Sequence, residues 1–182
     1  MSIIIRTRLE SGIELILRDP EKEDASAILD YLKIVGGESD NLLFGKSGVP
    51  FTVAQEENLI AEMRKDEGAL MVIGEVKGEI VSLANLVTPK RTRIAHNAEI
   101  ALSVRKDYWN QGVGRAVMTE LIDFARRHPN IHNVHLGVKK ENEAAIHLYE
   151  KMGFVRTGSH KDYFQIDGAF YDLVLMEMSP VR

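Results

Sequence analysis

Hydrophobic and polar positions recur along the chain with the two periods that are typical of strands and of helices. The first apolar run, at residues 13–17, predicts a short strand. Between residues 27 and 35 apolar side chains recur at helical spacing, and we expect Gly36-Gly37 to end that helix. The pattern therefore opens with a strand that is followed by a helix.

A second helix and three strands are predicted next. Thr52 and Gln55 form a capping box, and the helix that follows has an apolar stripe over 59–63. Three strand-like runs then lie at 69–76, 80–87 and 95–104. Because Lys77-Gly78 between the first two is a tight hairpin signal, we expect these strands to be antiparallel.

The second half of the chain predicts a crossover. Its elements are a helix, a strand, a second helix and two strands, at 113–127, 134–138, 143–152, 154–166 and 170–178. A strand, helix, strand connection in one sheet is parallel and right-handed, and Asp167-Gly168 joins the last two strands as a hairpin. We therefore predict a mixed α/β fold of about seven strands and about four helices, antiparallel in its first half with a parallel crossover at its centre.

Composition places the protein among ordinary globular chains. Apolar residues make up 45% and charged residues 27% of the 182 positions, without repeats or linkers, so we expect one domain over residues 1–182. The net charge of -4 argues against a nucleic acid partner, and the basic cluster at 90–93 is expected to be a solvated loop. There is no cysteine, no signal-peptide pattern and no apolar run of membrane length. We therefore expect a cytoplasmic protein without a membrane partner.

The sharpest local motif is Gln111-Gly112-Val113-Gly114-Arg115-Ala116, between a predicted strand and an amphipathic helix. Glycines let the backbone approach a ligand closely, and a helix N-terminus presents unpaired N–H groups that suit a phosphate or pyrophosphate. A turn that merely begins a helix is the alternative. The motif is not a dinucleotide fingerprint, because Val117 stands where a third glycine is needed, and it lacks the Gly-Lys-Ser/Thr ending of a P-loop.

A second motif, at residues 142–154, combines helix signals with a candidate catalytic side chain. Asn142 is a good N-cap and Gly153 is a good C-cap. The apolar stripe between them includes Ala145 and Tyr149. Taken alone, this pattern makes Tyr149 a core residue.

Together the two motifs resemble the GNAT superfamily of acyl-CoA-dependent N-acyltransferases. Residues 109–114 are similar to that family's Q/R-x-x-G-x-G/A loop, with Trp109 in the Gln/Arg place. Residues 142–154 are similar to its N-x-x-A-x-x-x-Y-x-x-x-G-F segment, and the order of elements is similar over nearly the whole chain. The resemblance implies a GNAT-like fold that moves the acetyl group of acetyl-CoA to an amine of a small molecule or a protein, without a metal.

The resemblance also implies which residues bind acetyl-CoA. The glycine loop would hold the pyrophosphate, Asn142 would contact the pantetheine arm, and Tyr149 would direct its hydroxyl at the thioester sulfur as a general acid. The arm would lie as a short pseudo-strand between strands 95–104 and 134–138, where a bulge near 101–103 opens a gap. The expected cofactor-binding residues are Leu102, Ser103, Val104, Asn110, Gln111, Gly112, Val113, Gly114, Arg115, Ala116, Asn142 and Ala145.

Glu99 is the candidate catalytic base. A period of two puts Glu99, Ala101 and Ser103 on one face of the predicted strand. A carboxylate on a central strand is costly unless it is paired or used, so Glu99 is either functional or on a solvated sheet face. In similar enzymes a glutamate at this place takes the proton from the attacking amine, and His96 is the next candidate by position.

Three histidines do not predict a metal site. His128, His132 and His135 are spaced at i, i+4 and i+7, but Pro129 breaks any helix that would align them.

The acceptor side and two rival functions stay open at this point. Glu38, Ser39 and Asp40 lie where the resemblance places acceptor recognition, and they fit a solvated turn equally well. A non-catalytic CoA-binding or regulatory domain would keep the glycine loop and lose Glu99 or Tyr149. A nucleotide-binding protein would need the loop early in the chain, in a parallel unit. A homodimer is compatible with the sequence.

Overall fold

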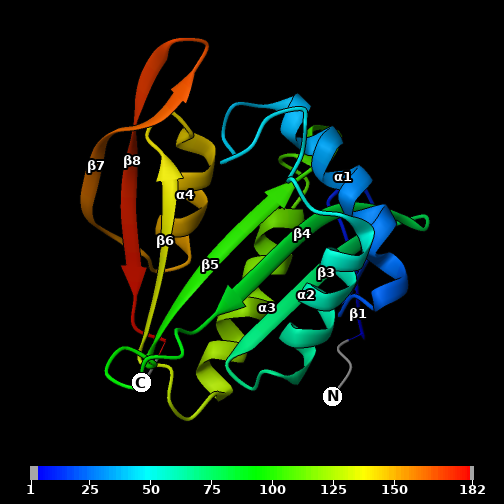
Figure 1. Ribbon diagram of the computed structural model, residues 1–182, viewed down its shortest axis with the longest axis horizontal. Coiled ribbons are helices and arrows are strands. Elements are labelled where there is room, and N and C mark those ends of the chain that lie inside the picture. The colour runs from blue at the N-terminus through cyan, green and yellow to red at the C-terminus, as the bar shows by residue number, and fades with distance from the viewer. Residues whose placement is uncertain (1–3, 181–182) are drawn as a thin grey trace.

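A computed structural model describes residues 4–180 as one mixed sheet with helices on both faces (Figure 1). The strands are β1 Ile4–Arg8, β2 Glu14–Arg18, β3 Ala69–Val76, β4 Glu79–Val87, β5 Asn97–Val104, β6 Asn133–Lys139, β7 Val155–Ile166 and β8 Ala169–Met178. The helices are α1 Ala25–Glu38, α2 Val53–Lys65, α3 Val113–Arg127 and α4 Glu143–Lys151, with short 3-10 turns η1 Lys22–Asp24 and η2 Lys106–Tyr108.

The sheet confirms the predicted fold class and its central crossover. Within the described residues its order is β1-β2-β3-β4-β5-β6-β8-β7, and β5 with β6 is the parallel pair. The eight strands exceed the predicted seven because of β1. Ile4 and Ile5 are exposed on this edge strand, so β1 carries none of the alternation of a half-buried strand that would reveal it.

Both predicted hairpins adopt the backbone that their sequences favour. Lys77 and Gly78 between β3 and β4 have φ of 53° and 82°, and Asp167 and Gly168 between β7 and β8 have φ of 49° and 82°. Two successive residues with positive φ match the twist of antiparallel strands, which explains why a glycine occupies the second place in each turn.

The helices divide the core in two. Side chains of α3 and α4 pack against one sheet face, with Ala98 and Ile100 of β5 among their contacts. Side chains of α1 and α2 pack against the other face over β3. Figure 1 shows the two helix pairs on opposite sides of the sheet. The face under α1 and α2 is the one toward which Glu99, Ala101 and Ser103 point, since Tyr31 of α1 reaches the hydroxyl of Ser103.

The first helix does not end where the sequence predicted. α1 continues through Gly36 and Gly37 to Glu38. A Cβ added at Gly36 would lie 2.2 Å from the carbonyl oxygen of Gly45, so the glycine lets the following loop lie directly against the helix. The glycines therefore serve a close backbone approach in place of a helix stop.

The two halves of the sheet separate beside β5. β5 and β6 pair only at Asn97, Ala98 and Glu99, although both strands continue beyond that point. Figure 1 shows them diverging from this junction. The expected bulge at 101–103 is absent, because the register of β4 with β5 is continuous from Ser82 to Val87. The gap arises because β6 turns away from β5.

Candidate active site

Peptide groups of β5 point into the gap between β5 and β6. The N–H of Arg105 donates to the carbonyl of Val81 at 2.9 Å, so residue 105 points its N–H at β4. Successive residues of a strand point their peptide groups to opposite edges. Leu102 and Val104 therefore present theirs to the gap, where no residue of β6 pairs with them. The peptide group of Ser103, in contrast, faces β4. Its side-chain hydroxyl is hydrogen-bonded to the hydroxyl of Tyr31 at 3.0 Å.

The glycine loop lies directly beyond the end of β5. Gly112 is the N-cap of α3 with φ 91°, a backbone conformation that favours glycine. The first α-helical bond runs from the N–H of Ala116 to the carbonyl of Gly112 at 3.0 Å. The N–H groups of Val113, Gly114 and Arg115 come before it and have no intrahelical acceptor. This helix end thus offers donors and a partial positive charge to an anion.

Side chains of the loop hold its shape. The indole of Trp109 donates to the carbonyl of Val104 at 2.8 Å, and the amide of Gln111 donates to the carbonyl of Asp107 at 2.7 Å. Asn110 takes φ 56° between them. Trp109, which departs from the family pattern, therefore fastens the loop to the strand end.

Gly114 is a point of close contact between the loop and α4. An added Cβ would lie 3.2 Å from a methyl carbon of Leu148. Val113 is buried in the core, whereas Arg115 is exposed beside the helix end. Packing at Val113 and Gly114 thereby fixes the loop against the core and α4. The cationic side chain of Arg115 lies on its exposed side.

The start of α4 brings Asn142 and Tyr149 to the same gap. The side-chain oxygen Oδ1 of Asn142 accepts from the N–H of Ala145 at 3.3 Å, which caps α4 and leaves the side-chain amide nitrogen without a partner in the described residues. Tyr149 lies two turns further along α4 and is 9% exposed. Its ring packs on Phe154 with centroids 6.0 Å apart. Core packing and a free hydroxyl therefore coexist in one side chain.

Burial raises the pKa of Tyr149 to about 12. Desolvation disfavours the phenolate, so the hydroxyl keeps its proton throughout the neutral range. No hydrogen bond of that hydroxyl occurs in the part of the chain that the structure describes. The hydroxyl of Tyr149 is therefore protonated at neutral pH, and it lines the cavity beside the gap.

One cavity of about 390 Å³ connects the start of α4 with Glu99 of β5. Glu99, Tyr149 and Asn142 all line it, together with Leu102 and Ser103. The volume suits a small molecule. Glu99 is exposed to this cavity and stands opposite His135 in the register of β5 with β6.

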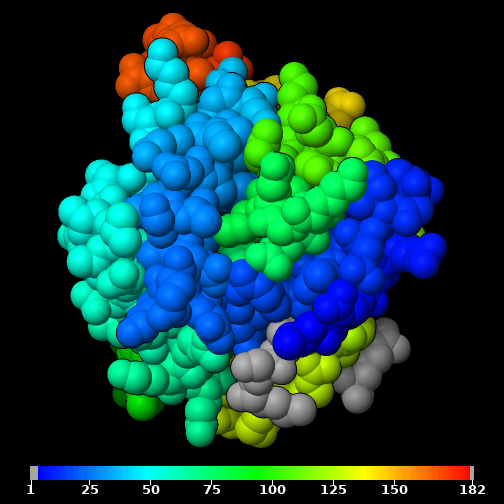
Figure 2. All heavy atoms as spheres, turned by 90° about the vertical axis from the view of Figure 1, so that its right-hand side faces the viewer, coloured from blue at the N-terminus to red at the C-terminus, as the bar shows by residue number. Residues whose placement is uncertain are grey.

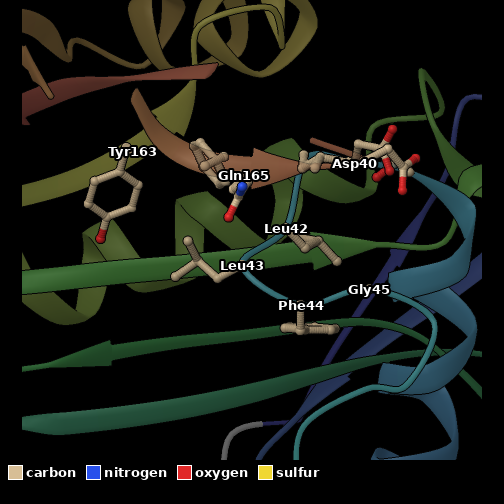
Figure 3. Close-up of a pocket in the computed structure, with 11 residues that line it drawn as sticks. Asp40, Leu42, Leu43, Phe44, Gly45, Tyr163 and Gln165 are labelled. Carbon is tan, nitrogen blue, oxygen red and sulfur yellow. The ribbon is translucent and has the colours of Figure 1, made fainter. Parts of the chain in front are cut away.

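A second cavity adjoins the first on the side of β7. It shares Leu42, Leu43, Phe44, Tyr163 and Phe164 with the first. Figure 3 shows the loop side chains Leu42 and Leu43 facing Gln165 and Tyr163 of β7. Figure 2 shows the segment after α1 reaching the end of β7 at the top of the molecule. The loop after α1 and β7 therefore enclose one end of the cavity.

Sequence reasoning missed most of the cavity lining, including two polar residues of α2 and β4, and it misplaced one residue. Glu56 of α2 and Asn85 of β4 line the cavity. The signal for Glu56 is its spacing of four from Ile60 on the buried face of α2. Glu38 instead bonds Nε of Arg105 and the N–H of Lys106, each at 2.7 Å, so it braces the loop after β5.

The remaining sequence predictions concern residues that do not line the cavity. Among residues 4–180 no group of three metal-binding side chains occurs, and His128 follows the last residue of α3. The cluster at 90–93 is an exposed turn in which Lys90 pairs with Asp66. No helix in the described part of the chain is long and apolar enough to span a bilayer.

Comparison with curated proteins gives several N-acetyltransferases among the relatives. The spermidine N(1)-acetyltransferase of Vibrio cholerae is 28% identical over 105 residues, which are 58% of this chain and 60% of that protein. The N-alpha-acetyltransferase RimI of Mycobacterium tuberculosis is 34% identical over 92 residues, which are 50% and 56% of the two chains. The chain thus spans less than two thirds of the length of these relatives.

Solved structures with the same fold cover most of both chains. A GNAT-family acetyltransferase from Streptococcus pneumoniae has a TM-score of 0.88 at 28% identity, over 91% of this chain and 99% of that one. A putative acetyltransferase from Salmonella typhimurium, solved with its cofactor acetyl-CoA, has a TM-score of 0.76 at 22% identity, over 91% and 94%. The second similarity is one of fold alone. The model of the Acetyltransferase (GNAT) family matches residues 40–154, more than half of the chain, and this protein therefore belongs to that family.

Proposed function

We propose that the protein is an N-acetyltransferase that moves the acetyl group of acetyl-CoA directly to a primary amine. The observation that carries the proposal is the shared cavity, which brings Glu99 and Tyr149 to either side of the gap between β5 and β6. A base and an acid on opposite sides of one cavity are what amine acylation needs. A CoA-binding domain without activity has no need of either group.

The residues beside the gap fit acetyl-CoA. The N–H groups at the start of α3 would hold the pyrophosphate, with Arg115 beside them. The peptide groups of Leu102 and Val104 and the amide nitrogen of Asn142 would pair with the amides of the pantetheine arm. When bound, acetyl-CoA supplies an activated acyl group and a thiolate leaving group.

Glu99 would take the proton from the acceptor. An alkyl ammonium with a pKa of about 10.4 is almost wholly protonated at pH 7, so attack requires a base. Glu99 is open to the cavity, and the described residues give its carboxylate no ion pair that would occupy it. The neutral amine then attacks the thioester carbonyl.

Backbone donors and Tyr149 would complete the transfer. The N–H groups of β5 that face the gap would stabilise the oxyanion, and a donor of this kind contributes about 3–4 kcal/mol where measured. Tyr149 would give its proton to the departing thiolate. The same burial that raises the pKa of Tyr149 would also destabilise a free thiolate, which keeps the transfer favourable.

The relatives support an amine acceptor. The names of three relatives give spermidine, an L-amino acid and the alanine of a ribosomal protein as their acceptors. These acceptors share an amino group and little else. The relatives therefore support the class of reaction and leave the choice among amines to the cavity.

Thiol release from acetyl-CoA in the presence of a panel of amines tests the proposal. We expect amine-dependent thiol release together with a product that is heavier by one acetyl group. Acetyl-CoA binding without turnover on any amine would instead favour the non-catalytic reading. Mass spectrometry of the protein after acetyl-CoA alone should detect no acetyl-enzyme, because transfer is direct.

A further inference from the structure

Glu56 is a buried carboxyl that the reaction proposed above does not use. It lies in the first turns of α2, where the capping box of Thr52 and Gln55 fixes the backbone. Its residue is only 2% exposed, on the same helix face as Ile60 and Met63. The other buried positions on this face of α2 hold apolar side chains, whereas this one holds an acid.

The carboxyl of Glu56 has no partner among residues 4–180. The structure gives it no ion pair and no side-chain hydrogen bond, and burial alone raises its pKa. A buried charge is costly unless it is paired, so such a group needs either a proton or a cation. Because Glu56 lines the cavity, an occupant of the cavity can supply the cation.

The charges of the cavity favour a cationic occupant. Its lining includes two carboxyls, Glu56 and Glu99, and no lysine, arginine or histidine. The remaining polar groups are neutral, and most of the wall is aliphatic or aromatic. An acceptor with a carboxylate would meet two acids and no base, whereas one with a second ammonium would meet a counter-charge.

The two carboxyls lie on different parts of the wall. Glu99 is on β5, and α2 packs against β3, two strands away. Neighbouring strands are about 4.8 Å apart, so β5 and the strand under α2 are offset by roughly 10 Å across the sheet. Met71 and Leu83 line the same cavity on the strands in between. The wall thus presents an acid, an apolar stretch and a second acid.

We propose that Glu56 binds the distal ammonium of the acceptor, which makes the preferred substrate a diamine with an aliphatic spacer. This inference rests on the proposed acetyltransferase function and deepens it. Glu56 acts as a specificity residue that orients the substrate, while Glu99 serves the amine that reacts.

A pair of matched acceptors tests the inference. 1,4-Diaminobutane and butylamine share a four-carbon chain and differ in the second amine. At saturating acetyl-CoA we expect kcat/KM to be higher for the diamine by about tenfold or more, as one charged hydrogen bond provides. Glu56→Gln keeps the shape and removes the charge, so it should lower kcat/KM for the diamine more than for butylamine and abolish that preference.

The control is Glu62→Gln, the same change of charge on the exposed face of α2. It should leave the preference intact. Equal kcat/KM for the two amines in the wild type, or an equal loss for both in a folded Glu56→Gln, would overturn the inference.

A binding measurement separates this inference from the proposed function. Calorimetric titration of 1,4-diaminobutane into the protein with CoA present requires no turnover. Binding that is weakened about tenfold by Glu56→Gln supports the inference even if no amine is acetylated. Binding that is unaffected by Glu56→Gln contradicts it even if diamines are acetylated.

Discussion

Three side chains in the cavity illustrate how function conflicts with stability at single residues. Tyr149 and Glu56 are buried without a hydrogen-bond partner in the described chain, and Glu99 sits unpaired on a central strand. Unpaired polar groups inside a protein weaken the fold. Elsewhere the same protein pairs its partly buried charges, as Arg18 shows between Asp24 and Glu75 at 2.7 Å from each. These three unpaired groups thus lie where a substrate could pair them.

Tyr149→Phe should reduce turnover without disturbing the fold. The change keeps the ring that packs on Phe154 and removes only the hydroxyl. Loss of a general acid lowers the rate by about 100-fold or more. Steady-state kinetics should show the fall in kcat, with acetyl-CoA affinity and Tm near wild type. Intact activity would make Tyr149 a core residue only.

Glu99→Gln should change the pH dependence of the reaction. Without the base, the enzyme depends on amine that is already neutral, so the depressed kcat/KM should partly recover as pH rises toward the amine pKa of about 10.4. Measuring kcat/KM across pH for both proteins checks this. A structural role would lower stability and leave the shape of the profile unchanged, and the base would then be sought at His96 or elsewhere.

Glu56 should make the ligand-free protein less stable as pH rises. Burial raises the pKa of Glu56 in the folded state, so the folded state holds this proton more tightly than the unfolded state. Its contribution is fully present below the ordinary glutamate pKa and is lost as pH rises through the higher folded value. The free energy of unfolding from urea titrations should show this decline in the wild type relative to Glu56→Gln. Parallel curves for the two proteins would contradict it.

At the scale of elements, the sequence predicts what periodicity and local turn chemistry control. The predicted α3 range is the observed one, and both hairpins form at the predicted dipeptides. The end of α1 was wrong because the role of Gly36 depends on Gly45, a contact distant from any local pattern. The gap beside β5 was expected from the family resemblance, but its origin in β6 is a matter of tertiary geometry.

The same distinction explains which site residues sequence reasoning found. The glycine loop and the start of α4 carry local motifs, so Gly112, Asn142 and Tyr149 were predicted together. Glu56 and Asn85 carry no motif, because only the packing of α2 and β4 around one cavity relates them to the site. The wall of such a cavity consists of residues that are distant from one another in the sequence. Their shared location can be recognised only from the three-dimensional fold.

Gly114→Glu should weaken acetyl-CoA binding through the N-terminus of α3. The new side chain adds bulk where an added Cβ would lie 3.2 Å from Leu148, and it places a negative charge at the helix end that we propose binds the pyrophosphate. We expect a loss of about tenfold or more, 1.4 kcal/mol, by calorimetry. Gly114→Ala is the control, since a flexible leucine can yield to a methyl group. Unchanged affinity in folded Gly114→Glu would remove the loop from the binding site.

At the scale of the whole molecule, the sheet consists of two halves that three residue pairs connect. β1 to β5 form one half and β6, β8 and β7 form the other, and they meet at Asn97, Ala98 and Glu99. On one face of the sheet, α3 and α4 pack into a core shared by both halves. On the cavity side, the loop after α1 and strand β7 line the cavity opposite each other (Figure 3). A ligand in the gap would bridge the two halves, so binding and global stability should be coupled.

Acetyl-CoA should therefore stabilise the whole fold and protect the gap most. At a ligand concentration of 100 times Kd the gain is about 2.7 kcal/mol, which for a chain of this size is on the order of 5–10 °C in Tm. ATP and NAD, which lack the pantetheine arm, should give much smaller shifts. Hydrogen exchange should slow most at Leu102 and Val104, whose peptide groups face the gap, and least in β1 at the far edge of the sheet. Equal stabilisation by ATP, or protection spread evenly over both edges, would mean that the ligand does not lie between β5 and β6.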